Sequence, residues 1–288
     1  MSEETQATAE PLVTYEQRGA VALITMNRPG VRNAQNADMT FQLDNAFLRA
    51  VNDDSVGAII LAGAGDHFSA GHDIGTPLRD IHRNFERRAT TYWPHEDKAG
   101  AEAIFVREAE LYLGMCRRWR ELPKPTIAMV QGACIAGGLM LAWVCDLIVA
   151  SDDAFFADPV LKMGIPGVEY FAHPFVMNPR IAKEFLYLGE RMTAARAYEA
   201  GMVNRVIPRA ELEARTFEIA NKLAAQPRFG IALAKRAINQ AEDRMGLRDS
   251  IDAVYGLHHV AHAHNSLTST DHLAGQDARS MAAAQRGK

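Results

Sequence analysis

The sequence has few cysteines and no pattern among them. Only three are present, and none stands in a C-x-x-C pair or in the spacing of a zinc site. An odd, unpatterned set argues against a disulfide framework and favours a reducing, cytoplasmic compartment. The first ten residues, MSEETQATAE, lack the basic and apolar stretches of a secretory signal, and we expect residues 1–11 to form a disordered tail.

Clustered positive charge is also missing. The chain carries 31 Lys and Arg against 35 Asp and Glu, a net charge of −4, and its basic residues are dispersed. A nucleic-acid-binding protein usually presents a basic stripe, so no nucleic-acid partner is expected. The one local group, Arg117, Arg118 and Arg120, has helical spacing and is predicted to face solvent.

The sequence lacks an uninterrupted apolar segment of membrane-spanning length. Residues 126–145 carry no charge and approach the roughly 20 residues that cross a bilayer. Gln131 and three glycines interrupt this stretch, so a strand, a glycine loop and a buried helix explain it better. No membrane association is expected.

The glycine-rich fingerprints of nucleotide-binding proteins are incomplete. Gly63-Ala64-Gly65 lacks the third glycine of a dinucleotide-binding loop, and residues 132–138 lack the Lys-Ser/Thr pair of a P-loop. A Rossmann-type or nucleotide-hydrolysing protein is therefore disfavoured.

What the chain does contain is an alternation of strand and helix signals. Short apolar runs rich in strand formers lie at residues 21–26, 57–62, 127–130 and 146–150, with 12–16 as a hairpin partner of the first. Between the first two runs, apolar residues recur at helical spacing from Met39 to Val51, behind an N-cap at Asn36 or Asp38. This alternation indicates an α/β core whose helices cover a sheet.

The amino-acid composition and pattern change after residue 193. Residues 194–288 are rich in alanine, have few strand signals and are punctuated by Pro208 and Pro227. We therefore divide the chain into a core at 12–193 and a helical C-terminal region at 194–288, which is suited to packing against other subunits.

Two glycine-bearing loops each follow a predicted strand. They are FSAGHDI at residues 68–74 and QGACIAGG at 131–138. A helix that opens at Gly137 leaves its first N–H groups unpaired and favours negative charge there. With an N–H from the turn at His72, these groups would form an oxyanion hole for an activated acyl group. Close packing of helix against strand explains the glycines equally well.

The order of these segments resembles the crotonase (enoyl-CoA hydratase/isomerase) superfamily over about residues 13–244. The matching pieces are ITMNRPGVRNAQN, GAIILAG, FSAGHDI, KPTIAMVQGACIAGG, CDLIVASDDAFFADP, MGIPG and TAARAYEAGMVNRVIP. The resemblance implies a crotonase-type ββα spiral core with a helical C-terminal trimerisation region, in a homotrimer or hexamer. It also implies an acyl-CoA substrate, with coenzyme A as part of the substrate and no separate cofactor.

The resemblance also assigns the binding residues. The thioester oxygen of relatives lies between two backbone N–H groups, which correspond to those of His72 and Gly137. Gly138, Met140 and Val160 line the acyl site. The coenzyme A portion is expected near two further segments, residues 28–32 and 70–74. The arginines of the first segment suit phosphate. The two segments contribute Arg28, Val31, Arg32, Ala70, Asp73 and Ile74.

Both usual catalytic carboxylates are missing. Typical hydratases of the superfamily carry two glutamates that hold the water and shuttle its proton. Met140 and Val160 occupy these positions here, whereas the oxyanion hole is retained. The apolar pair suits either a bulky apolar acyl chain in an active enzyme or a pocket that binds acyl-CoA without reaction.

Three other side chains are candidates for acid/base chemistry. Glu169 is the first, because it lies on the wall that faces the acyl group in relatives, and its apolar surroundings predict a raised pKa. The alternative for Glu169 is a salt bridge on a surface loop. Asp158 is the second, although turn chemistry at Asp158-Pro159 is favoured. His173 is the third. Weaker candidates are the side chains of His72, His82 and His95.

Four histidines lie close together near the C-terminus. His258 and His262 share a helix face at a spacing that zinc ligands use, with His259 and His264 beside them. No Glu or Cys accompanies them in the sequence, and the superfamily uses no metal. We therefore predict no metal site and a role in a helix or loop at a subunit interface.

Three functions remain open at this point. The first is an enoyl-CoA hydratase-like lyase of fatty acid metabolism, whose oxyanion hole stabilises an enolate and whose base has moved to Glu169 or Asp158. The second is another acyl-CoA reaction, such as isomerisation, thioester hydrolysis or C–C cleavage. The third is a catalytically silent acyl-CoA-binding protein.

Overall fold

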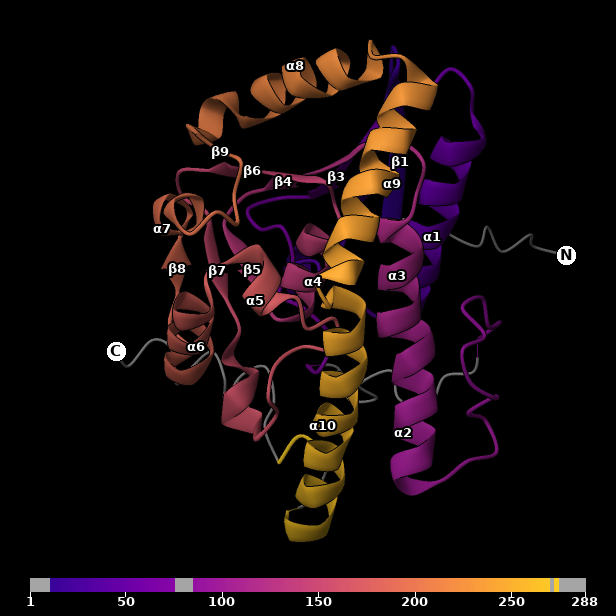
Figure 1. Cartoon of the computed structure of the whole chain (residues 1–288), viewed down its shortest axis with the longest axis vertical. Coiled ribbons are helices and arrows are strands. Elements are labelled where there is room, and N and C mark those ends of the chain that lie inside the picture. Colours follow the sequence, from indigo (N-terminus) through magenta and orange to yellow (C-terminus); the bar gives the residue numbers. More distant parts are fainter. Residues whose placement is uncertain (1–10, 76–84, 270–271, 275–288) are drawn as a thin grey trace, which may run out of the picture.

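The computed structural model describes residues 11–75, 85–269 and 272–274. The expected N-terminal tail lies outside the described residues except for Pro11, as does His82. Figure 1 shows helices packed around a sheet, with two long helices, α9 (Arg228–Arg244) and α10 (Leu247–Thr268), following one another along one side. The predicted α/β class and the helical C-terminal region are confirmed.

The main sheet has six strands, and every strand predicted from the apolar runs belongs to it. Their order is β1 (Val13–Arg18), β2 (Val21–Met26), β3 (Ala58–Gly63), β4 (Thr126–Val130), β6 (Leu147–Ser151) and β9 (Arg205–Ile207). β1 and β2 form an antiparallel hairpin, whereas the other neighbouring pairs are parallel. The loops that follow β3 and β4 therefore begin at the same end of the sheet, where the carboxyl ends of these strands lie.

A smaller sheet continues from the main one. It consists of β5 (Ala133–Ile135), β7 (Phe155–Ala157) and β8 (Met192–Thr193), each only two or three residues long. β5 and β7 are parallel, so the main chain after β4 and that after β6 stay in contact beyond the main sheet. The sequence pattern did not predict these strands, because runs this short carry no measurable periodicity.

The remaining helices pack around both sheets. They are α1 (Ala37–Asn52), α2 (Gly100–Glu108), α3 (Met115–Arg120), α4 (Gly137–Trp143), α5 (His173–Val176), α6 (Pro179–Leu188), α7 (Ala194–Glu199) and α8 (Leu212–Ala224), with short 3-10 helices η1 (Pro29–Val31), η3 (Pro159–Met163) and η4 (Arg209–Glu211). The predicted N-cap is confirmed at Asn36, whose side chain accepts a hydrogen bond from Met39 N.

Alternate residues of the central strands face two hydrophobic clusters. On β2, Val21 and Leu23 pack in the cluster beneath α8, whereas Ala22 and Ile24 belong to the larger cluster that includes α1. Strands buried on both faces need apolar residues at every position. This double burial explains why the predicted strands read as continuous apolar runs rather than as alternating ones.

The chain beyond residue 193 also contributes to the sheet. β9 pairs in parallel with β6, and α8 packs across β2, β3, β4 and β6. The division at residues 193 and 194 stays a prediction, although the sheet continues past it.

Residues 100–120 form one continuous helical segment with an irregular centre. A π-helical stretch, η2 (Ala109–Gly114), joins α2 to α3. Such stretches are rare and occur frequently at functional sites, because the wider turn changes which side chains share a face.

The prediction that the arginine cluster on α3 faces solvent is wrong. Arg120 is buried and pairs with Glu242 (2.8 Å) and Asp243 (3.1 Å) on α9, because α9 packs over this side of α3. Arg118 binds the buried carboxylate of Asp44 at 3.3 Å. These arginines therefore join helices that are distant in sequence.

The uncharged stretch at residues 126–145 is divided between β4, β5, a glycine turn and α4. Among the described residues, no helix combines the length and apolar character that crossing a membrane requires.

The three cysteines are free and buried, which makes their reactivity a test of the packing. Burial raises the pKa of the Cys145 thiol to about 12 and the pKa values of Cys116 and Cys134 well above the ordinary value. We predict that the folded protein at pH 8 barely reacts with a thiol-specific chromogenic reagent, because thiolate is the reactive form. Unfolding in guanidinium chloride should release three reactive thiols. Fast reaction of any thiol in the folded protein would contradict this packing.

Candidate active site

The two predicted glycine loops lie against each other. Ser69 N donates to Ala133 O (3.1 Å) and Ile135 N donates to Ser69 O (3.0 Å), so the loops run as a short parallel pair. A Cβ atom at Gly71, where φ is +91°, would lie 2.9 Å from Gly137 N. Only glycine fits this approach, and it brings the backbone of the His72 turn beside the first residue of α4.

Two backbone N–H groups are left without acceptors where the loops meet. Within the described part of the chain, the N–H groups of His72 and Gly137 donate to no oxygen. Ala136, just before α4, has φ +47° and ψ −116°, a conformation that costs an alanine free energy. Backbone strain of this kind is typical of functional turns. The arrangement is the one that an oxyanion hole requires, two adjacent donors with no internal partner.

The imidazole of His72 lies directly over Gly137. It stacks on the Tyr112 ring with centroids 3.6 Å apart, and its Nε2 lies 3.1 Å from Oε2 of Glu169. The resemblance assigns a role only to the backbone of His72, and its side chain is a weaker acid/base candidate from the sequence. The structure instead puts this side chain between the predicted oxyanion donors and the first predicted acid/base residue.

Glu169 is buried, with 4% of its surface exposed, and its predicted raised pKa is wrong. Burial does oppose ionisation of this carboxyl group, but contacts with His72 and the nearby His258 favour the carboxylate and lower its pKa. The sequence could not reveal this, because His258 lies 89 positions further along the chain. Glu169 is therefore held as a carboxylate.

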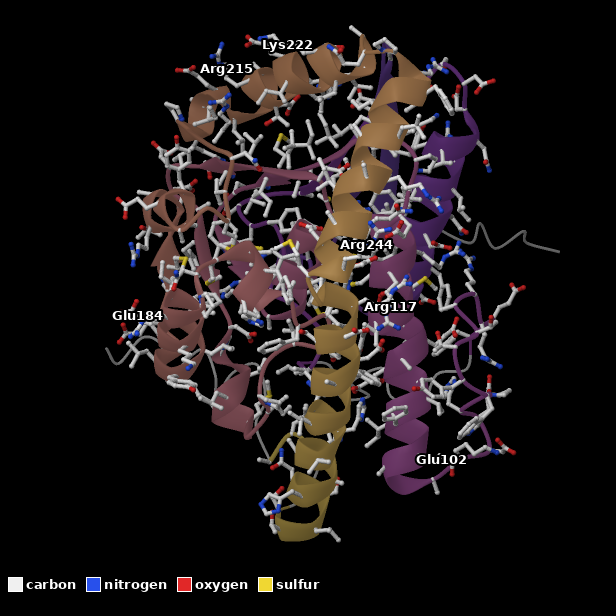
Figure 2. All side chains as sticks on the ribbon, in the orientation of Figure 1. Glu102, Arg117, Glu184, Arg215, Lys222 and Arg244 are labelled. Carbon is white, nitrogen blue, oxygen red and sulfur yellow. The ribbon has the colours of Figure 1, made fainter. Side chains whose placement is uncertain are left out.

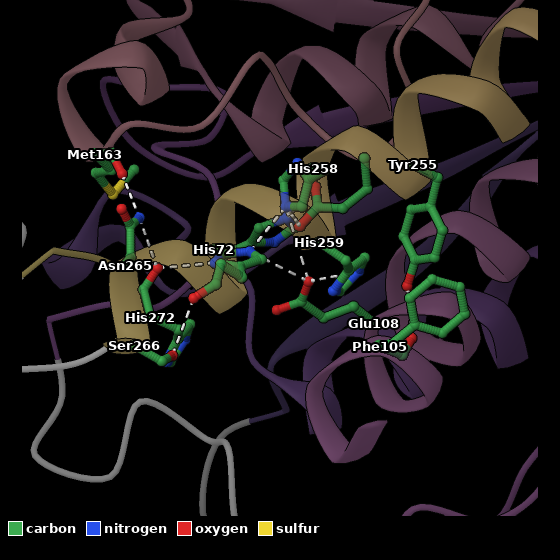
Figure 3. Close-up of polar contacts among 12 residues, drawn as sticks. His72, Phe105, Glu108, Met163, Tyr255, His258, His259, Asn265, Ser266 and His272 are labelled. Atoms are coloured by element: carbon green, nitrogen blue, oxygen red, sulfur yellow. Dashed lines mark hydrogen bonds and ion pairs between the residues drawn. The ribbon is translucent and has the colours of Figure 1, made fainter. Parts of the chain in front are cut away.

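A second buried acid, Glu108 at the end of α2, was missed by the sequence analysis. Burial and the neighbouring charge of Glu169 raise its pKa to about 7. Figure 3 shows Glu108 pointing at the histidines of α10. Its Oε2 lies 3.8 Å from His258 Nε2 and 3.6 Å from His262 Nε2. Nothing in the local sequence marks Glu108, since helix packing alone brings α2 beside α10.

The statement that no glutamate accompanies the C-terminal histidines is therefore wrong. His258, His259 and His262 are all buried, and the side chains of Glu108 and Glu169 lie beside them. His264 is exposed on the same helix.

Asp158 and His173 form a separate buried pair. His173 Nε2 lies 2.9 Å from Oδ2 of Asp158, and both side chains are fully buried. Asp158 also accepts a hydrogen bond from Val160 N (3.5 Å), which makes it the N-cap of η3. A second bond comes from Val168 N (3.4 Å). Among the described contacts, neither residue touches His72 or Glu169. This geometry favours the turn-forming interpretation of Asp158. His95 is also buried, stacked on Phe85.

The predicted acyl-site residues are tightly packed. Met140 and Val160 are 1% and 6% exposed and belong to the main hydrophobic cluster. A Cβ at Gly138 would lie 2.6 Å from Ser69 O, so this glycine permits α4 to approach the first loop.

The residues expected near coenzyme A come together from two segments. Ala70 N donates to Arg32 O (2.9 Å), which ties the first loop to η1. Arg28 pairs with Asp73 at 3.0 Å, and Val31 is exposed. Ile74 is partly buried against the main hydrophobic cluster.

Comparisons with known proteins show which family the chain belongs to. The enoyl-CoA hydratase/isomerase family model matches residues 16–272. A Mycobacterium tuberculosis protein named as an enoyl-CoA hydratase, EchA13, is 42% identical over 255 residues, covering 85% of this chain and 78% of that protein. 4-Chlorobenzoyl coenzyme A dehalogenase-2 of an Arthrobacter species is 33% identical, covering 79% of this chain and 78% of that enzyme.

A solved structure extends the similarity to three dimensions. The crystal structure of a Mycobacterium smegmatis protein described as an enoyl-CoA hydratase has a TM-score of 0.81 and 44% identity, covering 91% of this chain and 98% of that one. The two sheets, the helical C-terminal region and the joined glycine loops define a crotonase-type enzyme fold. The chain belongs to the enoyl-CoA hydratase/isomerase family.

The contact between His72 and Gly137 gives a direct test of the site geometry. A Cβ at Gly137 would lie 2.7 Å from His72 Cε1, and Tyr112 blocks the ring from retreating. We predict that Gly137→Ala lowers the free energy of unfolding by about 1–3 kcal/mol through overpacking. The matched control is Gly256→Ala in α10, where a Cβ meets open space and should stabilise the helix by up to about 1 kcal/mol. Urea unfolding measures both, and equal stability of Gly137→Ala and the unmodified protein would refute the contact.

Proposed function

We propose that the protein binds an acyl-CoA thioester and stabilises an enolate-like oxyanion with the N–H groups of His72 and Gly137. The observation that carries the proposal is the meeting of two glycine loops around two donors without internal partners. Preorganised N–H groups of this kind stabilise charge that develops in the transition state. The family relatives, whose names include enoyl-CoA hydratases and a coenzyme A dehalogenase, support an acyl-CoA substrate.

The reaction that this site supports best is hydration of a 2-enoyl-CoA with Glu169 as the base. The buried carboxylate accepts a proton from water as the oxygen of that water bonds to the β-carbon. Negative charge then develops on the thioester oxygen between the two N–H groups. Glu169 returns the proton to the α-carbon, which leaves the 3-hydroxyacyl-CoA product. The contact with His72 orients the carboxylate toward the oxyanion donors.

A second candidate is a different reaction of an acyl-CoA, in which Glu169 attacks or deprotonates the acyl group. Its support is the dehalogenase relative together with Met140 and Val160 at the positions where typical hydratases carry glutamates. Mass spectrometry of products from a panel of acyl-CoAs separates the two. Hydration adds the mass of one water, isomerisation leaves the mass unchanged, and hydrolysis releases free coenzyme A.

Assembly into a homotrimer or hexamer is part of the same proposal. Large apolar side chains are exposed along α9 and α10, including Phe229, Ile238, Met245 and Leu267. Exposed apolar surface of this extent is typical of subunit interfaces.

Replacing the proposed base tests the mechanism. We predict that Glu169→Gln lowers kcat for enoyl-CoA hydration about a hundredfold to ten-thousandfold, the range that general base catalysis contributes. The control is Glu184→Gln on the surface of α6, labelled in Figure 2, which should leave kcat unchanged. Loss of the conjugated enoyl absorbance gives the rate. Undiminished turnover by Glu169→Gln would exclude Glu169 as the base.

A further inference from the structure

A compact group of buried metal-ligating side chains lies beside the proposed acyl site. Glu108 on α2 and His258 and His262 on α10 are 8%, 3% and 3% exposed. Each offers one ligand atom, and these three atoms lie within 4.8 Å of one another. Figure 3 shows Glu108 and His258 approaching each other from these two helices.

The ring orientations of both histidines are fixed by backbone carbonyls. His258 Nδ1 lies 2.9 Å from Gly167 O, and His262 Nδ1 lies 2.9 Å from His272 O. A carbonyl can only accept, so each Nδ1 carries the proton and donates it. In the neutral imidazole, each Nε2 then keeps a lone pair that is directed into the cluster. This arrangement, with one ring nitrogen on a carbonyl and the other free, is the usual one for metal-binding histidines.

The inward-facing ligand atoms of the cluster lie unusually close together. The Nε2 atoms of His258 and His262 face each other at 2.9 Å, which is unfavourable for two lone pairs unless a proton or a metal ion lies between or beside them. Glu108 Oε2 is buried and makes no hydrogen bond with the described residues. A buried carboxylate oxygen without a hydrogen bond and two opposed lone pairs are costly in a protein interior.

We propose that Glu108, His258 and His262 bind a divalent first-row transition-metal ion of the Zn²⁺ type. Imidazole and carboxylate are ligands that such ions prefer, and two histidines with one glutamate form a known catalytic zinc set with an open position. Tetrahedral bonds of about 2.0–2.1 Å place ligand atoms about 3.3 Å apart. The two Nε2 atoms are 2.9 Å apart, and Glu108 Oε2 lies 3.6 and 3.8 Å from them, so the separations fall on both sides of this value.

The proposed ion would lie next to the acyl site rather than on a remote surface. Oε1 of Glu169 is 3.8 Å from His258 Nε2, and the other oxygen of Glu169 contacts His72. His259 also points at Glu108, with its Nε2 3.5 Å from Oε2, and both of its ring nitrogens lack hydrogen bonds. His259 is thus the nearest residue that could fill the fourth position on the ion, and a water molecule is the alternative.

Metal content and Co²⁺ spectroscopy test the proposal without any substrate. The full-length protein is analysed by plasma mass spectrometry as purified, then stripped with a chelator and titrated with Co²⁺ and Zn²⁺. We expect up to one metal ion per chain and visible d–d absorption bands at one Co²⁺ equivalent that Zn²⁺ abolishes. Zn²⁺ at a hundredfold excess over its Kd should raise Tm by roughly 5 °C or more.

Variants localise the binding. His262→Gln and Glu108→Gln should each weaken Zn²⁺ binding at least tenfold, whereas His264→Gln, on the exposed side of the same helix, should bind as the unmodified protein does. Stripped unmodified protein that gives neither Co²⁺ bands nor a shift in Tm would overturn the proposal, and this result is decisive even where a variant does not fold. Equal loss of binding in His264→Gln would also overturn it. Enoyl-CoA turnover is measured separately on the same samples, so hydration and metal binding can fail independently.

Discussion

The parallel pairing of β3 with β4 is the constraint on which the site depends. Because both strands point the same way, the glycine loops that follow them emerge side by side and hydrogen bond through Ser69. Gly71 then permits an approach to Gly137 N that a Cβ would prevent, and Gly137 leaves room for the imidazole of His72. The two N–H donors and the imidazole of His72 all take their positions from this approach. The proposed chemistry therefore depends on strand direction and on two positions that carry no side chain.

Much of this arrangement is readable in the sequence. The buried strands appear as continuous apolar runs because both faces of the sheet are covered, and the helix cap at Asn36 follows from local hydrogen bonding. The glycine loops that carry the proposed oxyanion donors could be predicted for the same reason, since glycine loops after strands are local features. Short strands such as β5 were missed because two or three residues set no period.

The polar interior of the site could not be predicted in the same way. Glu108 reaches the site only because α2 packs beside α10, about 150 residues later, and the π-helical stretch alters the face it shares. The pKa of Glu169 was predicted with the wrong sign, since burial alone was considered and the histidines that favour its carboxylate are distant in sequence. Arg120 was assigned to solvent for a similar reason, because α9 covers it. Contacts between segments distant in sequence decide all three features, and such contacts leave no periodic pattern in the sequence.

The central claim, that the thioester oxygen accepts hydrogen bonds from the N–H groups of His72 and Gly137, is most directly tested by vibrational spectroscopy of a bound ligand. A saturated acyl-CoA, with and without ¹³C at its thioester carbonyl, is bound to the protein, and the isotope-edited C=O stretch is compared with that of the free thioester. Strong donors polarise the carbonyl and lower its stretching frequency, so we predict a clear downward shift on binding. A bound acyl-CoA whose carbonyl keeps the frequency that it has in water would contradict the oxyanion hole.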